Sequence, residues 1–258
     1  MSLAALVFDV DGTLAETEEL HRQSFNEAFA AAGLSWHWNK DLYGRLLEVT
    51  GGKERIAHWI EGHNARPALD KAAIAQLHAD KTARYTGLMA GGTLPLRPGV
   101  LRLLDEARAA GLRLAIATTT SMPNVVALLC ASMGPSALSR FAVIAAGDVV
   151  PAKKPAPDVY QLVLDRLRLP PEQCVAVEDT VNGLRSAMGA GIPTLITCSL
   201  YGGTRGFDGA LAVVNHLGDT DQPCRVLHGP ALPRPVVGLD GINGWLASYH
   251  GGGFREGA

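Results

Sequence analysis

Apolar residues in this chain gather in short runs that do not alternate with polar residues, and several runs end in acids or hydroxyls. Such runs are typical of strands covered on both faces, as in a parallel sheet. Stretches with helical spacing separate them, and repeated strand-helix units favour right-handed crossovers. The sequence therefore predicts an α/β fold with a doubly wound, Rossmann-like parallel sheet. The expected strands cover residues 3–8, 112–118, 141–146, 174–177, 193–197 and 211–215, and the expected helices between them cover residues 100–110, 124–133, 158–167 and 181–190.

A long stretch between the first two expected strands has a helical pattern throughout. Paired glycines and two prolines in residues 91–99 cannot continue a helix and indicate a return linker. We expect an inserted α-helical cap at residues 16–95, above a core of residues 1–15 and 96–218. Residues 219–258 are rich in Gly and Pro and are expected to lie along the surface, with a loose end from Gly251 to Gly253. The expected cap helices cover residues 18–32, 41–47, 53–62 and 70–89.

Composition narrows the classes of partner. The 258 residues are 47% hydrophobic, enough to bury a full core, and the formal net charge is -2. There is no overall basic field to favour nucleic acid or an anionic membrane, so we expect neither partner, and we expect a monomer. Four cysteines without a C-x-x-C pair argue against zinc and disulfides. We expect a cytoplasmic protein, although a plastid protein without its transit peptide would look the same.

Asp9 and Asp11 directly follow the first expected strand, and Gly12 completes the pattern D-x-D-G. Ligands of parallel sheets bind at the carboxyl ends of strands, so both carboxylates are expected at the mouth of a site. Two carboxylates repel by about 4 kcal/mol at 4 Å with an effective dielectric constant of 20. A cation would remove that repulsion, and carboxylate oxygens suit Mg²⁺. A lone D-x-D-G is more typical of a simple turn. The choice between a turn and a cation site therefore depends on the polar groups that later segments offer.

Three later segments offer further polar groups. The hydroxyls and N–H groups of residues 118–121 can hold a phosphoryl oxygen, and they can also cap the next helix. Lys154 can balance the charge of a phosphoryl group, whereas a solvated basic turn explains the neighbouring Lys153 better. Glu178 and Asp179 end another buried run; they can serve as helix caps, or Asp179 as a Mg²⁺ ligand with Glu178 as a ligand or an acceptor behind it.

These segments together resemble the haloacid dehalogenase-like (HAD-like) phosphotransferases. The run from Asp9 to Thr13 resembles their first motif, D-x-D-G-T, and Thr118 matches the second. Lys154 lies in a version of K-P-x-P-D, the third, and Glu178 with Asp179 resembles the fourth. Within the β-phosphoglucomutase-like subgroup, the runs E-T-E-E-L-H and T-G-G-K-E-R most resemble the CbbY group, which dephosphorylates xylulose 1,5-bisphosphate, an inhibitor of Rubisco.

The resemblance implies a Mg²⁺-dependent sugar-bisphosphate phosphatase. Asp9 is then the nucleophile that forms an aspartyl-phosphate, and Asp11 is the general acid and base. Thr118 and Lys154 bind the transferring phosphate. The expected Mg²⁺ ligands are Asp9, Asp11, Glu178 and Asp179, and the expected substrate-binding residues are Glu18, His21, Thr50, Gly51, Gly52, Lys53, Arg55, Thr119, Thr120 and Lys154.

The cap and the reaction each have a second interpretation. Lys53 and Arg55 also fit a solvated helix face. The nearest rival function is a phosphosugar mutase of the β-phosphoglucomutase type, although such mutases tend to carry valine where this chain has Thr13. The sequence also leaves open a phosphatase for another small phosphosugar and, more distantly, a non-catalytic phosphosugar sensor. The intact Asp9 and Asp11 argue against the sensor.

Overall fold

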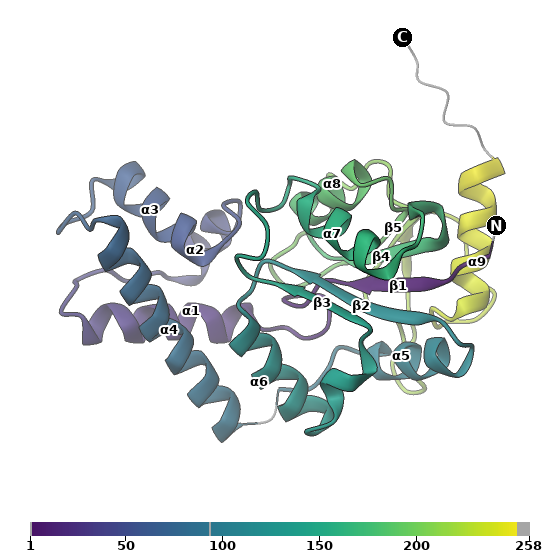
Figure 1. Ribbon diagram of the computed structural model, residues 1–258, viewed down its shortest axis with the longest axis horizontal. Helices are drawn as coiled ribbons and strands as arrows, with labels where there is room; N and C mark the ends of the chain where they lie inside the picture. Colours follow the sequence, from purple (N-terminus) through teal and green to yellow (C-terminus); the bar gives the residue numbers. More distant parts are fainter. Residues whose placement is uncertain (1, 93, 252–258) are drawn as a thin grey trace, which may run out of the picture.

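A single sheet organises the chain in the computed structural model, which describes residues 2–92 and 94–251 (Figure 1). Within these residues, seven strands are ordered β3-β2-β1-β4-β5-β6-β7. The first six pair in parallel, and β7 is antiparallel to β6. The predicted fold class is confirmed. The strands are β1 (Ala5–Phe8), β2 (Arg113–Thr118), β3 (Val143–Ala146), β4 (Cys174–Glu178), β5 (Thr194–Thr197), β6 (Ala212–Val214) and β7 (Val226–His228).

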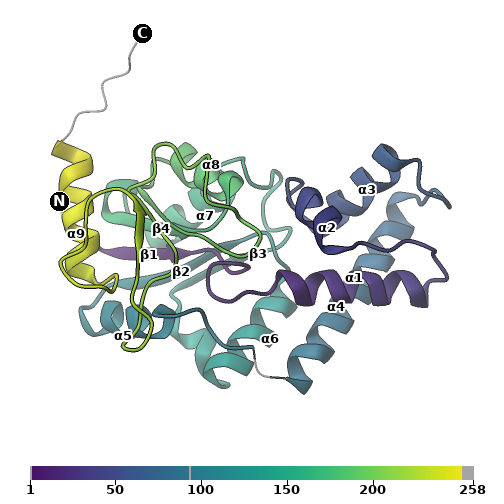
Figure 2. The same ribbon diagram turned by 180° about the vertical axis from the view of Figure 1, so that it is seen from behind.

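Helices cover both faces of this sheet (Figures 1 and 2). Leu6 and Phe8 of β1 belong to a hydrophobic cluster with α5, α6 and α9. Ala5 and Val7 face the opposite way and belong to a cluster with α7 and α8. Burial on both faces explains why the strand sequences do not alternate. These helices are α5 (Val100–Ala109), α6 (Met122–Met133), α7 (Asp158–Leu167), α8 (Val181–Gly189) and α9 (Leu239–Gly251).

The segment between β1 and α5 forms a separate helical layer at one end of the sheet (Figure 1). Its core is aromatic: the Phe25 ring lies 4.7 Å from that of Trp38, and the Phe29 ring lies 4.8 Å from that of Trp38. Trp36 and Trp38 are buried in this cluster. The helices are α1 (Glu18–Ala31), α2 (Lys40–Leu46), α3 (Gly52–His63) and α4 (Lys71–Gly91).

The segment after Asp219 contains two elements that the sequence analysis did not predict, β7 and α9. In α9, Ile242, Trp245 and Leu246 are buried in the main core, at a spacing typical of a helix. Glycines within and around α9 hid this pattern. Gly251 is the last residue of α9, and Gly252 and Gly253 lie outside the described residues.

Among the described residues, no helix is both long enough and apolar enough to cross a membrane.

Candidate active site

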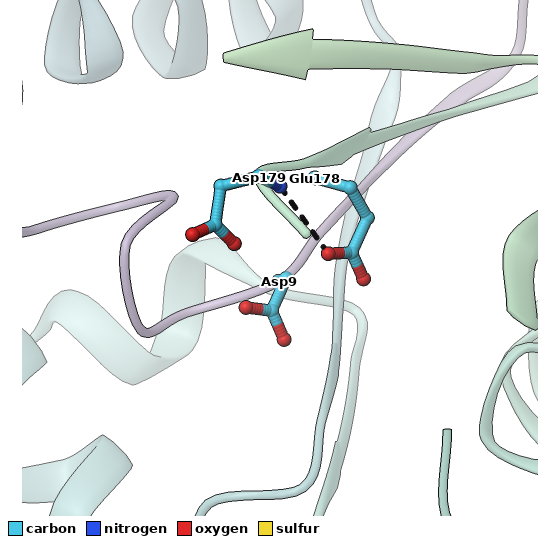
Figure 3. A group of neighbouring side chains, drawn as sticks. All are labelled: Asp9, Glu178 and Asp179. Carbon is cyan, nitrogen blue, oxygen red and sulfur yellow. Dashed lines mark hydrogen bonds between the residues drawn. The ribbon is translucent and has the colours of Figure 1, made fainter. Parts of the chain in front are cut away.

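Three buried carboxylates meet where β1 and β4 end (Figure 3). Asp9 follows β1, Glu178 ends β4 and Asp179 follows it; their exposed fractions are 8%, 0% and 2%. One oxygen from each lies within 4.8 Å of the others. Because β1 and β4 are parallel neighbours, their carboxyl ends bring these side chains together.

Lys154 is the cation inside this acidic group. Its Nζ donates to Asp9 Oδ1 at 2.7 Å, to Glu178 Oε1 at 2.6 Å and to the Ala117 carbonyl at 2.8 Å. Burial favours the neutral amine, but the two carboxylates outweigh it and raise the pKa of Lys154 above its ordinary value. Glu178 Oε1 also accepts from Tyr160 Oη at 2.6 Å. Glu178 therefore lies behind Lys154 and fixes its position.

One lysine does not neutralise three carboxylates. Burial raises the pKa of Asp9, and with the added effect of the Glu178 and Asp11 charges it reaches about 8 despite the opposing charge of Lys154. Burial and the charges of Asp9 and Glu178 also raise the pKa of Asp179 well above its ordinary value. Such a group gains stability when a cation joins it, and hard carboxylate oxygens suit a divalent ion such as Mg²⁺. The residues therefore fit a metal site.

Backbone at two glycines passes very close to these acids. A Cβ on Gly12 would lie 2.1 Å from Asp179 Oδ2, and Gly12 has a φ of +78°. A Cβ on Gly183 would lie 1.9 Å from Glu178 Oε2. Any larger residue at either position would displace a carboxylate, so both positions require glycine.

Asp11 is not a member of the group formed by Asp9, Glu178 and Asp179. Its Oδ1 accepts from Thr17 Oγ1 at 2.5 Å and contacts His21 Nε2 at 3.0 Å. Lys81 Nζ lies 2.6 Å from His21 Nδ1. When Lys81 is protonated it can only donate, so His21 Nδ1 then accepts and His21 Nε2 carries the hydrogen that is donated to Asp11. Burial alone would raise the pKa of Asp11, but His21 and Thr17 lower it to about 2.

Lys81 is buried among rings, with 3% of its surface exposed. Its Nζ lies 4.8 Å from the centre of the Phe25 ring and 5.3 Å from that of Tyr85. Burial lowers the pKa of Lys81 to about 7, and Asp11 and Glu18 oppose that shift. Lys81, His21 and Asp11 thus form a line of hydrogen bonds from the helical layer to the motif aspartate.

Both layers line one cavity of about 370 Å³. Thr118 lies at the end of β2 with 1% exposed, and its Oγ1 accepts from the Thr120 N–H at 3.2 Å. Glu178 lies behind the wall of this cavity and does not line it. The predicted site residues in the wall are Asp9, Asp11, Glu18, His21, Thr50, Gly51, Gly52, Lys53, Arg55, Thr118, Thr119, Thr120, Lys154 and Asp179.

Several predicted residues of the helical layer already have protein partners. Lys53 Nζ donates to Asp148 Oδ2 at 2.5 Å, across the cavity mouth to the loop after β3. Lys153 Nζ donates to the other oxygen of Asp148 at 2.7 Å. Thr50 Oγ1 accepts from Asn182 Nδ2 at 3.1 Å. These bonds join residues near the start of α3 to the sheet layer.

Arg55 and Glu18 are held within the helical layer. The Arg55 guanidinium donates to the carbonyls of Leu46 and Val49 and to Tyr43 Oη, at 3.1 to 3.3 Å. Tyr43 Oη donates to Glu18 Oε2 at 2.8 Å. No described carboxylate forms an ion pair with Arg55, so its positive charge is not neutralised.

The sequence analysis missed Lys81, Asp148, Tyr160 and Asn124 as residues of the site. A signal existed for Lys81, because it follows Ile74 and Leu77 on the buried stripe of α4, where a lysine is unusual. Asp148 follows β3 and could have been found as another acid at a strand end. Tyr160 and Asn124 carry no such signal, since both fit ordinary helix positions.

Known proteins resemble this chain over most of its length. The sequence model of the haloacid dehalogenase-like hydrolase family matches residues 3–191. Protein CbbY of Cupriavidus necator is 48% identical over 252 residues, covering 96% of this chain and 98% of that protein. The CBBY-like protein of Arabidopsis thaliana is 40% identical over 226 residues, covering 85% and 70%.

A solved structure is also similar. It is a mutant CbbY from Rhodobacter sphaeroides in complex with xylulose 1,5-bisphosphate, with 50% identity and a TM-score of 0.81, covering 85% of this chain and 98% of that chain. The expected resemblance to the CbbY group is confirmed, and the chain belongs to the haloacid dehalogenase-like hydrolases.

Proposed function

We propose that this chain is a Mg²⁺-dependent phosphatase that converts xylulose 1,5-bisphosphate to xylulose 5-phosphate through an aspartyl-phosphate on Asp9. A CbbY that is 50% identical binds this bisphosphate. The observation that carries the proposal is the opposite environment of two aspartates only two residues apart. Asp9 lies beside Lys154, whereas Asp11 lies beside His21. Such a pair can divide nucleophilic and proton-transfer roles.

The chemistry follows from these environments. The Asp9 carboxylate attacks phosphorus, while Lys154 and Thr118 stabilise charge on the phosphoryl oxygens. Asp11 gives its proton to the departing sugar oxygen and later accepts one from the water that hydrolyses the aspartyl-phosphate. His21 keeps Asp11 ionised in the free enzyme, which suits the second step. An anionic substrate beside Asp11 favours its protonated form, which suits the first.

Asp9 and Asp179, with Glu178 behind them, would hold the metal ion. When bound, Mg²⁺ supplies charge neutralisation for the phosphoryl group and for the clustered acids. Asp11 is the fourth ligand expected from the sequence, but its side chain is bonded to Thr17 and His21 instead. We therefore assign the Asp11 carboxylate to proton transfer.

A second phosphate fits the other wall of the cavity. Arg55 and Lys81 both line it, and no described carboxylate forms an ion pair with either. Their charges favour a distal anion, and binding it can supply free energy for aligning the reacting end. This supports a sugar bisphosphate over a monophosphate.

Residues 16–95 would then act as a cap that closes on residues 1–15 and 96–218. The separate aromatic cluster of the helical layer supports movement as a unit. The Lys53–Asp148 ion pair supports a closed arrangement. Closure would exclude water from the first displacement.

The test is a panel of sugar monophosphates and bisphosphates, with and without Mg²⁺, measured as kcat/KM. We expect xylulose 1,5-bisphosphate to rank first and to release inorganic phosphate. Phosphorus NMR would separate this from a mutase, which returns the phosphoryl group to another hydroxyl. Binding of a phosphosugar without turnover would indicate a sensor and overturn the proposal.

The protein is further proposed to work as a monomer. Light scattering of the purified protein tests this. The chain has relatives in a bacterium and in a plant, so the proposed compartment is the bacterial cytoplasm or the chloroplast stroma. Removal of this bisphosphate there would protect Rubisco during carbon fixation. Cell fractionation tests the compartment.

A further inference from the structure

Two polar side chains at the start of α6 lack hydrogen bonds that buried groups ordinarily make. Asn124 has 2% of its surface exposed, and its Nδ2 donates to Thr120 Oγ1 at 3.1 Å. Its Oδ1 is buried without a partner among the residues that the structure describes. The buried Oγ of Ser121 also has none in that part of the chain, and Ser121 makes no side-chain cap bond although it is the N-cap residue.

Both residues line the cavity between the two layers. A buried acceptor without a donor is destabilising, because it has lost water and gained nothing in return. The missing donor can come from whatever fills the cavity. A phosphate dianion carries no hydrogen to donate, whereas a sugar hydroxyl does. The unsatisfied Oδ1 therefore suits the sugar part of a ligand rather than its phosphate.

We propose that Asn124 is a specificity-determining residue whose Oδ1 accepts a hydrogen bond from a hydroxyl of the substrate sugar, with Ser121 as a neighbouring contact. This inference rests on the proposed sugar-phosphatase function. Asn124 takes no part in the chemical step, for which Asp9, Asp11 and Lys154 are present. It distinguishes phosphate esters of hydroxylated sugars from other phosphate esters.

The experiment compares substrates that differ by one hydroxyl. It uses xylulose 1,5-bisphosphate, its 3-deoxy and 4-deoxy analogues, and p-nitrophenyl phosphate. We expect the wild type to prefer the parent sugar over one deoxy analogue by roughly ten- to hundredfold in kcat/KM, the range for one buried hydrogen bond. Asn124→Ala should abolish that preference and change turnover of p-nitrophenyl phosphate by no more than about twofold.

Two further variants sharpen the result. Asn124→Leu keeps the branched shape of the side chain, with a larger volume, and removes both polar atoms, so it should behave like Asn124→Ala even where the smaller variant folds poorly. Asn182→Ala is the matched control, since Asn182 lines the same cavity but its amide is bonded to the Glu48 carbonyl and Thr50. It should leave the ratio between parent and deoxy sugars unchanged.

Equal losses on sugar and aryl phosphate would mean that Asn124 only orients Thr120, and would overturn the inference. Retained discrimination against the deoxy analogues would overturn it as well. If the wild type rejects xylulose 1,5-bisphosphate, the proposed substrate is wrong, and the same ratio is measured on the sugar phosphate that ranks first in the panel. If no sugar phosphate is hydrolysed, the inference about Asn124 fails together with the proposed function.

Discussion

The two walls of the cavity hold charge in different ways. The wall of the sheet layer is acidic: Asp9 lines it and Glu178 lies behind it, and their carboxylates contact Lys154 at 2.6 to 2.7 Å. The wall of the helical layer is cationic, and its buried cations Arg55 and Lys81 contact carbonyls, hydroxyls, rings or an imidazole. One wall therefore suits a metal ion and the other an anion.

The walls also differ in how they are built. Strand ends fix the acidic wall, because parallel pairing sets the positions of the residues that follow β1 and β4. Helix packing fixes the cationic wall, where Lys81 of α4 reaches His21 of α1 across 60 residues of sequence. This difference separates residues that act on the reacting phosphate from residues that align the rest of the substrate.

The largest effect is expected from Asp9→Asn. The amide cannot attack phosphorus, so turnover should fall by at least about a thousandfold on every substrate. The variant should remain folded, as judged by circular dichroism and thermal melting. Hydrolysis at the wild-type rate would show that Asp9 is not the nucleophile. The acidic wall would then not be the place where the reaction occurs.

Metal removal should be nearly as damaging. EDTA should abolish activity and Mg²⁺ should restore it, because the acids that surround Lys154 carry excess negative charge. Asp179→Ala should raise the Mg²⁺ concentration needed for half-maximal rate, or eliminate activity. Activity that persists after chelation, or that depends on zinc alone, would contradict the proposed site.

Lys81→Met tests the connection between the walls. Without Lys81, His21 Nδ1 loses its donor and the imidazole can adopt the tautomer that cannot donate to Asp11. On a sugar monophosphate, which has no distal phosphate for Lys81 to bind, we expect kcat to fall about a hundredfold with a small change in KM, since general acid-base catalysis is affected. Lys71→Met, an exposed position of the same helix, is the control. A normal kcat would show that Asp11 works without this line of hydrogen bonds.

Sequence patterns were informative for the acidic wall and less so for the cationic one. Asp9, Lys154 and Asp179 each lie at the end of a buried run or in a proline-fixed turn, where local sequence determines direction. Lys53 and Arg55 line the cavity, but their bonds to Asp148 and to carbonyls depend on packing between distant segments. No local pattern records such contacts.

The same distinction holds for the fold. Six parallel strands were predicted because each contains a short apolar run that does not alternate with polar residues. The C-terminal β7 and α9 were missed, since β7 is a three-residue edge strand and α9 contains internal glycines. Their stability comes from tertiary contacts, such as the bond from Trp245 Nε1 to the Pro230 carbonyl at 2.8 Å.

A comparison of Lys53→Ala with Asp148→Ala distinguishes two roles for Lys53 at the cavity mouth. If Lys53 binds the distal phosphate, Lys53→Ala should cost about 2 kcal/mol in kcat/KM for the bisphosphate, and Asp148→Ala should cost little. If Lys53 only holds the layers together, both variants should show the same small loss. Turnover of p-nitrophenyl phosphate serves as the reference in each case. Matching losses would restrict the anion site to Arg55 and Lys81.

The smallest expected effect concerns His78, which lines the cationic wall. Burial and the charges of Lys81, Lys53 and Lys153 lower the pKa of His78 to about 3. An unfolded chain protonates this histidine below about pH 6.5, whereas the folded chain does not. His78 therefore reduces the free energy of unfolding as pH falls from about 6.5 towards 3, by no more than about 1.4 kcal/mol per pH unit.

His78→Gln should remove this dependence, so urea titrations at pH 8 and pH 5 should show the variant gaining stability relative to wild type at the lower pH. His58→Gln, at an exposed position of α3, should follow the wild type. The same pH dependence of the free energy of unfolding in all three proteins would mean that the cationic wall tolerates another positive charge. The difference in charge between the two walls would then be smaller than their side chains indicate.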